Sequence, residues 1–135
     1  MNSSKSATTC TCGSTLPYSQ CCGPLLDGMR TADTAESLMR SRYSAYCRGD
    51  RDYLLQTWAM ETRPKDLVLD NTQHWLGLKI KNTQAGLSED SEGMVHFVAR
   101  YKIAGRGYRL EEKSRFKRVN GKWTYFDGEI IDAKQ

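Results

Sequence analysis

The sequence has no long apolar run, and no segment approaches the roughly 20 consecutive apolar residues that a membrane-spanning helix needs. Residues 1–9, MNSSKSATT, contain one lysine and no apolar stretch, so they lack the form of a secretory signal peptide. They are rich in Ser and Thr, and we expect them to form a disordered tail. These absences argue against membrane association and favour the reducing cytoplasm, where disulfides are rare.

The residue arrangements that mark common enzyme active sites are also missing. The chain has only two histidines, His74 and His96, and neither has an identifiable acid or nucleophile as partner. We find no Ser/His/Asp or Cys/His arrangement, no phosphate-binding glycine loop and no distinctive pair of carboxylates. The sequence therefore favours a non-enzymatic protein over an enzyme.

Cysteine, in contrast, is concentrated at one place. Four of the five cysteines fall within thirteen residues, as the two close pairs Cys10/Cys12 and Cys21/Cys22. Four converging thiolates make a closed tetrahedral site for zinc. Gly13-Ser14 and Gly23-Pro24 follow the two pairs and supply turns where the chain must bend. The pattern predicts one structural Zn²⁺ bound by all four cysteines.

Three other interpretations of the cluster are less favoured. Two disulfides would need an oxidising compartment. A redox pair at Cys21-Cys22 would lack the Cys-x-x-Cys spacing and the βαβ unit of thioredoxin-like proteins. A catalytic metal would need an open coordination position, which four thiolates do not leave. The fifth cysteine, Cys47, falls in an expected helix and is interpreted as a small buried apolar residue.

The remaining sequence predicts one small domain in which helices come first. Of the 135 residues, 39% are hydrophobic and 27% are charged, which is ordinary globular composition. A first helix is expected to start at Asp33 with Glu36 in a capping box and to stop at Gly49. A second helix follows from Asp50, and a third, shorter one is expected to start at Asp70 and to carry Trp75, Leu76 and Leu78.

After Ile80 the apolar residues alternate, which is the period of strands. A weak strand is expected within 80–90, followed by strands over 94–103, 108–119 and 122–131. Turns are predicted at Gly105-Arg-Gly107 and at Asn120-Gly121, the latter as a type I′ hairpin. Helices followed by an antiparallel meander indicate an α+β fold.

The cysteine pattern resembles the SEC-C motif, a zinc knuckle at the C-terminus of the SecA translocation ATPase. The whole chain resembles the YchJ family of small bacterial proteins, through the stretch Thr34–Tyr46, Trp75 and the Gly121-Lys-Trp123-x-Tyr125 ending. The resemblance implies an NTF2-like domain over 27–135, a cone-shaped sheet wrapped around helices, preceded by a SEC-C-like zinc knuckle over 10–26. It implies no reaction.

Three functional hypotheses follow. In the first, the protein is a non-enzymatic adaptor whose knuckle docks a protein partner. The resemblance implies a SecB-like chaperone or the ribosome as that partner. Alternatively, the knuckle only fixes the N-terminus to the domain. In the second, the cone is the pocket of a small-molecule-binding protein or a hydrolase- or isomerase-type enzyme. The candidate pocket residues are His96, Tyr101, Tyr108 and Asp127, with His74 a further possibility.

In the third hypothesis, basic strands contact nucleic acid or the ribosome. Nine basic residues against two acidic ones lie between Arg100 and Lys122. Four of them alternate onto one face of a predicted strand: Arg109, Lys113, Arg115 and Lys117. A solvated charged face is the more common explanation for such a pattern. Arg40 and Arg42, among apolar residues of the first helix, are candidates for buried ion pairs with Asp50, Glu61 or Asp127, and the family resemblance implies a structural role for both.

Overall fold

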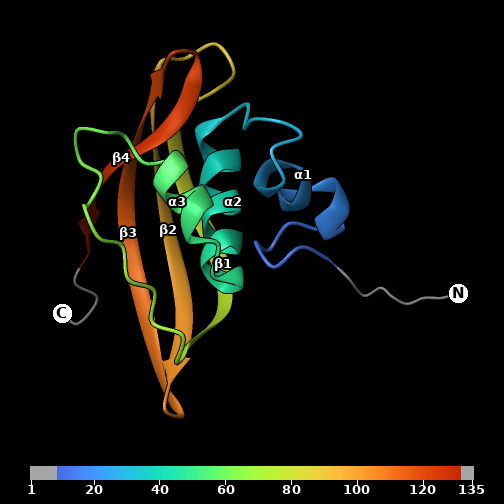
Figure 1. The fold of residues 1–135 in the computed structure, drawn as a ribbon, viewed down its shortest axis with the longest axis vertical. Coiled ribbons are helices and arrows are strands. Elements are labelled where there is room, and N and C mark those ends of the chain that lie inside the picture. The colour runs from blue at the N-terminus through green and yellow to red at the C-terminus, as the bar shows by residue number, and fades with distance from the viewer. Residues whose placement is uncertain (1–8, 132–135) are drawn as a thin grey trace, which may run out of the picture.

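The computed structural model describes residues 9–131, so the tail expected over 1–9 lies, apart from Thr9, outside the described residues. Short helices precede a four-stranded sheet, as expected for an α+β fold (Figure 1). The helical elements are η2 (Tyr18–Gln20), α1 (Cys22–Leu26), α2 (Ala35–Arg48) and α3 (Arg51–Gln56). The strands are β1 (Gln73–Ala85), β2 (Glu92–Ile103), β3 (Arg106–Val119) and β4 (Lys122–Ile130). Among residues 9–131, no helix has both the length and the apolar character that crossing a bilayer requires.

Helix α2 lies between the sheet and the N-terminal segment that carries the cysteines (Figure 1). Its N-cap is Thr34, whose side chain accepts a hydrogen bond of 3.0 Å from the Ser37 amide, so the predicted start at Asp33 was wrong by one residue. Glu36 forms an ion pair with Arg40 rather than closing a capping box. The predicted stop at Gly49 is confirmed, because this glycine has the left-handed φ of 70° that a helix C-cap favours.

Helix α3 begins at the predicted cap, since the Asp50 side chain accepts a hydrogen bond of 3.1 Å from the Tyr53 amide. It ends before Trp58. The chain beyond it lies along the edge of the sheet, where Ala59 donates to the Tyr125 carbonyl at 2.9 Å and Tyr125 donates to the Thr57 carbonyl at 2.8 Å. This pairing covers the outer edge of β4.

The predicted third helix is wrong, because residues 73–85 form the edge strand β1. A β-bulge explains the misleading pattern. Trp75 pairs with Tyr101 and Leu78 with Ala99, so two residues three positions apart point to the same face of the sheet. The bulged residue, Leu76, is 56% exposed. The bulge gives a strand the apolar spacing of a helix.

The four strands form an antiparallel meander in the order β1-β2-β3-β4. The hairpin at Asn120-Gly121 is confirmed, with φ of 53° and 81° as a type I′ turn requires. The turn predicted at Gly105-Arg-Gly107 lies one residue earlier, at Ala104-Gly105, with φ of 52° and 80°. Arg106 and Gly107 already belong to β3.

The core lies between the helices and one face of the sheet. Alternate residues of β2, Val95, Phe97 and Ala99, are buried there as their spacing predicts. Leu38 of α2 and Phe116 of β3 are also fully buried in this layer. We call this the inner face of the sheet; the outer face carries most of the charged side chains of β2 and β3.

Candidate metal centre

The four cysteines of the knuckle (residues 10–26) converge on one point. The Sγ atoms of Cys10, Cys12, Cys21 and Cys22 all lie within 4.8 Å of one another. Cys12 and Cys21 are 3.6 Å apart, and Cys21 and Cys22 are 3.9 Å apart. Tetrahedral bonds of about 2.3 Å to a central ion separate thiolate sulfurs by roughly 3.8 Å. The cluster therefore has the dimensions to hold a metal ion.

Local backbone turns bring the two pairs together. The Cys10 amide donates to the Leu16 carbonyl at 2.8 Å, and the Gly13 amide donates to the Cys10 carbonyl at 3.2 Å. These bonds fold the segment back so that η2 returns the chain to Cys21 and Cys22. Gly13 has φ of +90°, and a β-carbon there would lie 2.9 Å from the Leu78 carbonyl oxygen of β1. Glycine is required at this contact between the knuckle and the sheet.

The knuckle belongs to the main core of the protein. Cys10, Cys12 and Cys22 are 4%, 0% and 1% exposed, and all three pack in the same apolar cluster as Leu38 of α2. Only Cys21 is partly exposed. A site this closed leaves little room for an external ligand at the ion.

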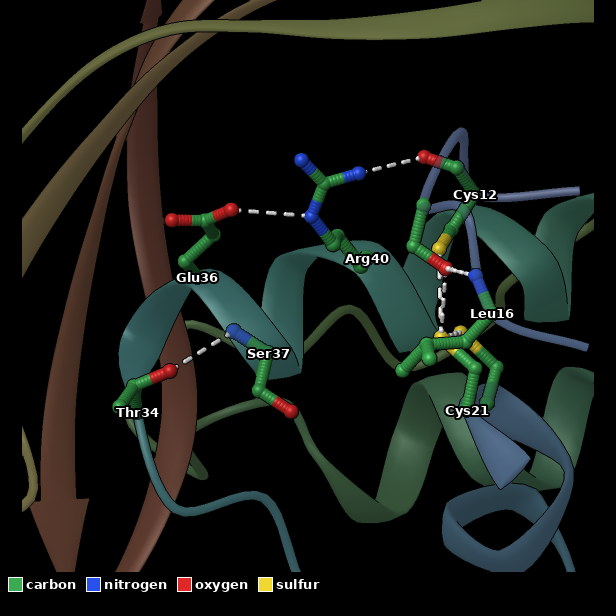
Figure 2. Close-up of polar contacts among 9 residues, drawn as sticks. Cys12, Leu16, Cys21, Thr34, Glu36, Ser37 and Arg40 are labelled. Atoms are coloured by element: carbon green, nitrogen blue, oxygen red, sulfur yellow. Dashed lines mark hydrogen bonds and ion pairs between the residues drawn. The ribbon is translucent and has the colours of Figure 1, made fainter. Parts of the chain in front are cut away.

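Polar contacts from α2 fix the position of the site (Figure 2). Arg40 Nη1 donates to the Cys12 carbonyl at 2.8 Å, while Arg40 Nε donates to Glu36 Oε2 at 3.0 Å. Ser44 Oγ lies 2.9 Å from Thr11 Oγ1 and 3.6 Å from Cys10 Sγ. Ser14 Oγ lies 3.1 Å from Cys21 Sγ. Such outer contacts orient ligands around a metal.

Three of the clustered cysteines have shifted pKa values. A hydrogen bond from the Cys22 thiol lowers the pKa of Cys12 to about 4, and the same bond raises the pKa of Cys22. Burial raises the pKa of Cys21. The metal-free cluster thus favours one thiolate, and a bound cation would have to displace the remaining thiol protons. Cys47 lies outside the cluster, is half-buried, and has its pKa raised by burial.

Neither arginine forms an ion pair with the three candidate carboxylates. Arg40 pairs with Glu36, as described above. Arg42 is 3% exposed and donates through Nη1 to the Leu54 carbonyl at 2.9 Å and to Thr57 Oγ1 at 2.7 Å. Across residues 9–131 no carboxylate forms an ion pair with it. Asp50 caps α3, Glu61 lies near Lys117, and Asp127 pairs with Arg115.

The four candidate pocket residues are not brought together. His96 lies on the outer face with its Nε2 2.6 Å from Glu111, and Asp127 lies there too, accepting a 2.6 Å bond from Arg115 Nε. The rings of Tyr101 and Tyr108 stack on the inner face with centroids 5.2 Å apart, near the β2–β3 turn. His74 is exposed on β1. Because side chains alternate between the two faces of a sheet, His96 and Asp127 lie on the opposite face from the two tyrosines.

A cavity does open on the inner face, but other residues line it. Its volume is about 200 Å³, and its walls come from α2, the segment after α3, and strands β1 to β4. The polar side chains in it include Arg42, Glu112 and Ser114. The sequence signal for this site was a charged residue, Arg42, on the apolar stripe of a helix, which we interpreted as structural.

The candidate basic face lies on the outer side of β3. Arg109 pairs with Glu111 at 3.0 Å, Arg115 pairs with Asp127, and Lys117 lies 3.9 Å from Glu61. Lys113 is exposed. Three of the four cations thus have a carboxylate within 4 Å, which reduces the field that the face offers to phosphates.

Comparison with known proteins finds relatives that match nearly the whole chain. The UPF0225 protein SCO1677 of Streptomyces coelicolor is 48% identical over 91% of this chain and 96% of its own length. A UPF0225 protein of Chromobacterium violaceum is 47% identical over 95% of this chain and 98% of its own.

Two solved structures have the same fold. RPA3114, a SEC-C motif containing protein from Rhodopseudomonas palustris, is 35% identical with a TM-score of 0.80, covering 91% of this chain and 98% of that one. A SEC-C motif containing protein from Psychrobacter arcticus is 26% identical with a TM-score of 0.69, covering 93% of this chain and 81% of that one. Residues 34–128 match the family described as "YchJ, middle NTF2-like domain". The chain therefore belongs to the YchJ family, with a SEC-C-type cysteine cluster packed beside its NTF2-like domain.

Proposed function

We propose that this protein binds one Zn²⁺ through Cys10, Cys12, Cys21 and Cys22, and that it acts as a non-enzymatic binding module whose knuckle docks a protein partner. The observation that carries the proposal is the mutual approach of the four Sγ atoms to within 4.8 Å. Four thiolates in tetrahedral spacing are typical of structural zinc sites.

The proposed role of the ion is structural because its four ligands fill a tetrahedral shell. A catalytic zinc keeps a position for water or substrate, and this ligand set leaves none. The knuckle has only a few apolar residues of its own, so metal binding supplies the folding energy that it lacks. The ion thereby fixes residues 10–26 against α2.

A fixed knuckle is suited to docking because a rigid surface binds with little ordering cost. Beside Cys21, between the knuckle and the start of α2, the surface has a hollow of about 250 Å³. Leu16, on the rim of this hollow, is 48% exposed, and Arg30 and Glu36 offer both charges next to it. These features support a protein partner that inserts an apolar side chain beside the zinc site.

Metal analysis of the reduced, purified protein tests the zinc assignment. We expect one zinc per chain in the wild type and in Cys47→Ser, the matched control that keeps the cluster intact. The double variant Cys21→Ser/Cys22→Ser is expected to lose the metal. A wild-type protein with less than one zinc, or with another metal at full occupancy, would refute the assignment.

The docking role is tested by pull-down with variants that keep the metal. Leu16→Asp changes the rim of the hollow without touching a ligand, and Val68→Asp, at a residue 86% exposed on the segment before β1, is the control. A protein retained by wild type and Val68→Asp but lost with Leu16→Asp supports docking. If every protein retained by the wild type is also retained by Leu16→Asp and by the cysteine double variant, the knuckle does not dock a partner and only fixes the N-terminal segment to the domain.

A further inference from the structure

The cavity of about 200 Å³ on the inner face has the composition of a small-molecule site. Its walls are largely aromatic and aliphatic, with Tyr43, Trp75, Phe97 and Leu110 among them. A few polar groups converge in an apolar pocket, which is how proteins orient small ligands. The volume is below the roughly 300–1,000 Å³ that drug-sized ligands occupy, so the occupant would be a small molecule.

The most unusual group in this cavity is the buried cation of Arg42. Its guanidinium packs against two aromatic rings that contact each other, 4.9 Å from the centroid of Trp58 and 4.7 Å from that of Tyr125. Nη1 donates to the Leu54 carbonyl and to Thr57 Oγ1, and the Tyr46 hydroxyl is a further hydrogen-bond partner of the guanidinium. A guanidinium has five N–H donors, so these partners leave donors for another group. Glu112 lies in the same cavity, but within the described residues no carboxylate forms an ion pair with Arg42, so a ligand anion that reaches this buried cation would be favoured.

A second donor lines the same cavity. The indole Nε1 of Trp58 is buried and has no hydrogen-bond acceptor in the described part of the chain. An unpaired buried donor costs about 1–3 kcal/mol, which a ligand acceptor would recover. Arg42 and Trp58 are adjacent, so one group with two acceptor oxygens can serve both.

Glu112 limits how an anion can lie in the cavity. Its Oε2 accepts hydrogen bonds from Ser114 Oγ at 2.6 Å and from Tyr125 Oη at 3.0 Å. These two hydroxyls hold the carboxylate in place, and its charge would repel a second carboxylate. The anionic group of a ligand should therefore face Arg42 and Trp58, with its apolar part against the aromatic walls.

We propose that this cavity binds a small carboxylate with a flat or branched apolar body, its oxygens accepting from Arg42 and from Trp58 Nε1. The site goes beyond the metal-dependent role of the knuckle. None of its residues is a metal ligand, so loss of docking and loss of ligand binding can be told apart.

The test is an NMR titration with benzoate as the probe, observing the indole N–H signals. Trp58 is expected to shift in a saturable way, and Trp123 is the internal control because its Nε1 already donates to the Asp33 carbonyl at 3.1 Å. Benzamide and benzylamine, which keep the ring but are neutral or cationic, should bind far more weakly. Absence of a saturable Trp58 shift, or equal binding of benzamide or benzylamine, would overturn the proposal.

Variants separate recognition from folding. Trp58→Phe keeps a ring and removes one donor, so benzoate affinity should fall about fivefold. Glu112→Gln removes the repelling charge and should strengthen benzoate binding. Arg42→Met should weaken it about 30-fold. If Trp58→Phe and Glu112→Gln, both folded, bind benzoate like the wild type, neither the Trp58 donor nor the Glu112 charge acts on the carboxylate, and the proposed binding mode is wrong.

Discussion

At the scale of single residues, two contacts hold the knuckle against the rest of the protein. Gly13 approaches the Leu78 carbonyl, and Arg40 bonds the Cys12 carbonyl while held by Glu36. Neither contact involves a cysteine sulfur. We expect both to set the position of the cysteine cluster relative to the sheet, because they join the knuckle to β1 and α2 on two sides.

Gly13→Ala tests this position, with Gly28→Ala as its matched control. Both glycines have positive φ, +90° and +80°, but a β-carbon at Gly28 meets nothing within 4 Å. Gly28→Ala should cost only the backbone strain, about 1–2 kcal/mol. Gly13→Ala should cost more, because the β-carbon also meets the Leu78 carbonyl oxygen. Urea denaturation of the metal-loaded proteins measures both, and equal losses would mean that the contact with β1 is unimportant.

At the scale of elements, short sequence patterns correctly predicted those helices and turns that depend on interactions between residues close in sequence. Apolar spacing predicted α2, the Asp50 cap predicted α3, and Asn120-Gly121 predicted the last hairpin, because each depends on residues close in sequence. A weak strand was expected within 80–90 and overlaps the end of β1, but the first part of β1 was missed because its bulge depends on pairing with β2, which the sequence of β1 alone does not reveal. A pocket in the cone was a hypothesis, but its lining was missed for a similar reason, since Arg42, Trp58 and Glu112 meet only in the folded chain.

The bulge itself makes a prediction that a regular strand would not. Leu76 lies outside the core, so Leu76→Lys should change the free energy of unfolding by less than about 0.5 kcal/mol. Leu78 packs against the core on the inner face, so Leu78→Lys should be clearly destabilising. In a regular strand without the bulge, the two residues would share one face of the sheet and respond alike. Chemical denaturation distinguishes the cases, and a large loss with Leu76→Lys would contradict the strand register.

At the scale of the whole molecule, α2 serves two sites at once. Arg40 and Ser44 contact the knuckle, whereas Arg42, Tyr43 and Tyr46 line the cavity. The metal site and the cavity therefore share one helix without sharing a side chain in these contacts. This arrangement predicts that a bound ion stabilises more than the knuckle itself (residues 10–26), because any loosening of the knuckle removes packing from the side of α2 that faces away from the sheet.

Metal removal measures this coupling. After chelation we expect hydrogen exchange to become fast across residues 10–26 and faster in α2, because the buried cysteines lose the ion that holds them together. The central strands β2 and β3 should remain protected, since their partners and the inner core lie within the NTF2-like domain. Cys47→Ser should behave like the wild type before and after chelation. Unchanged exchange in α2 would show that the knuckle is only an appendage, while uniform loss of protection in β2 and β3 would show that the domain cannot fold without its metal.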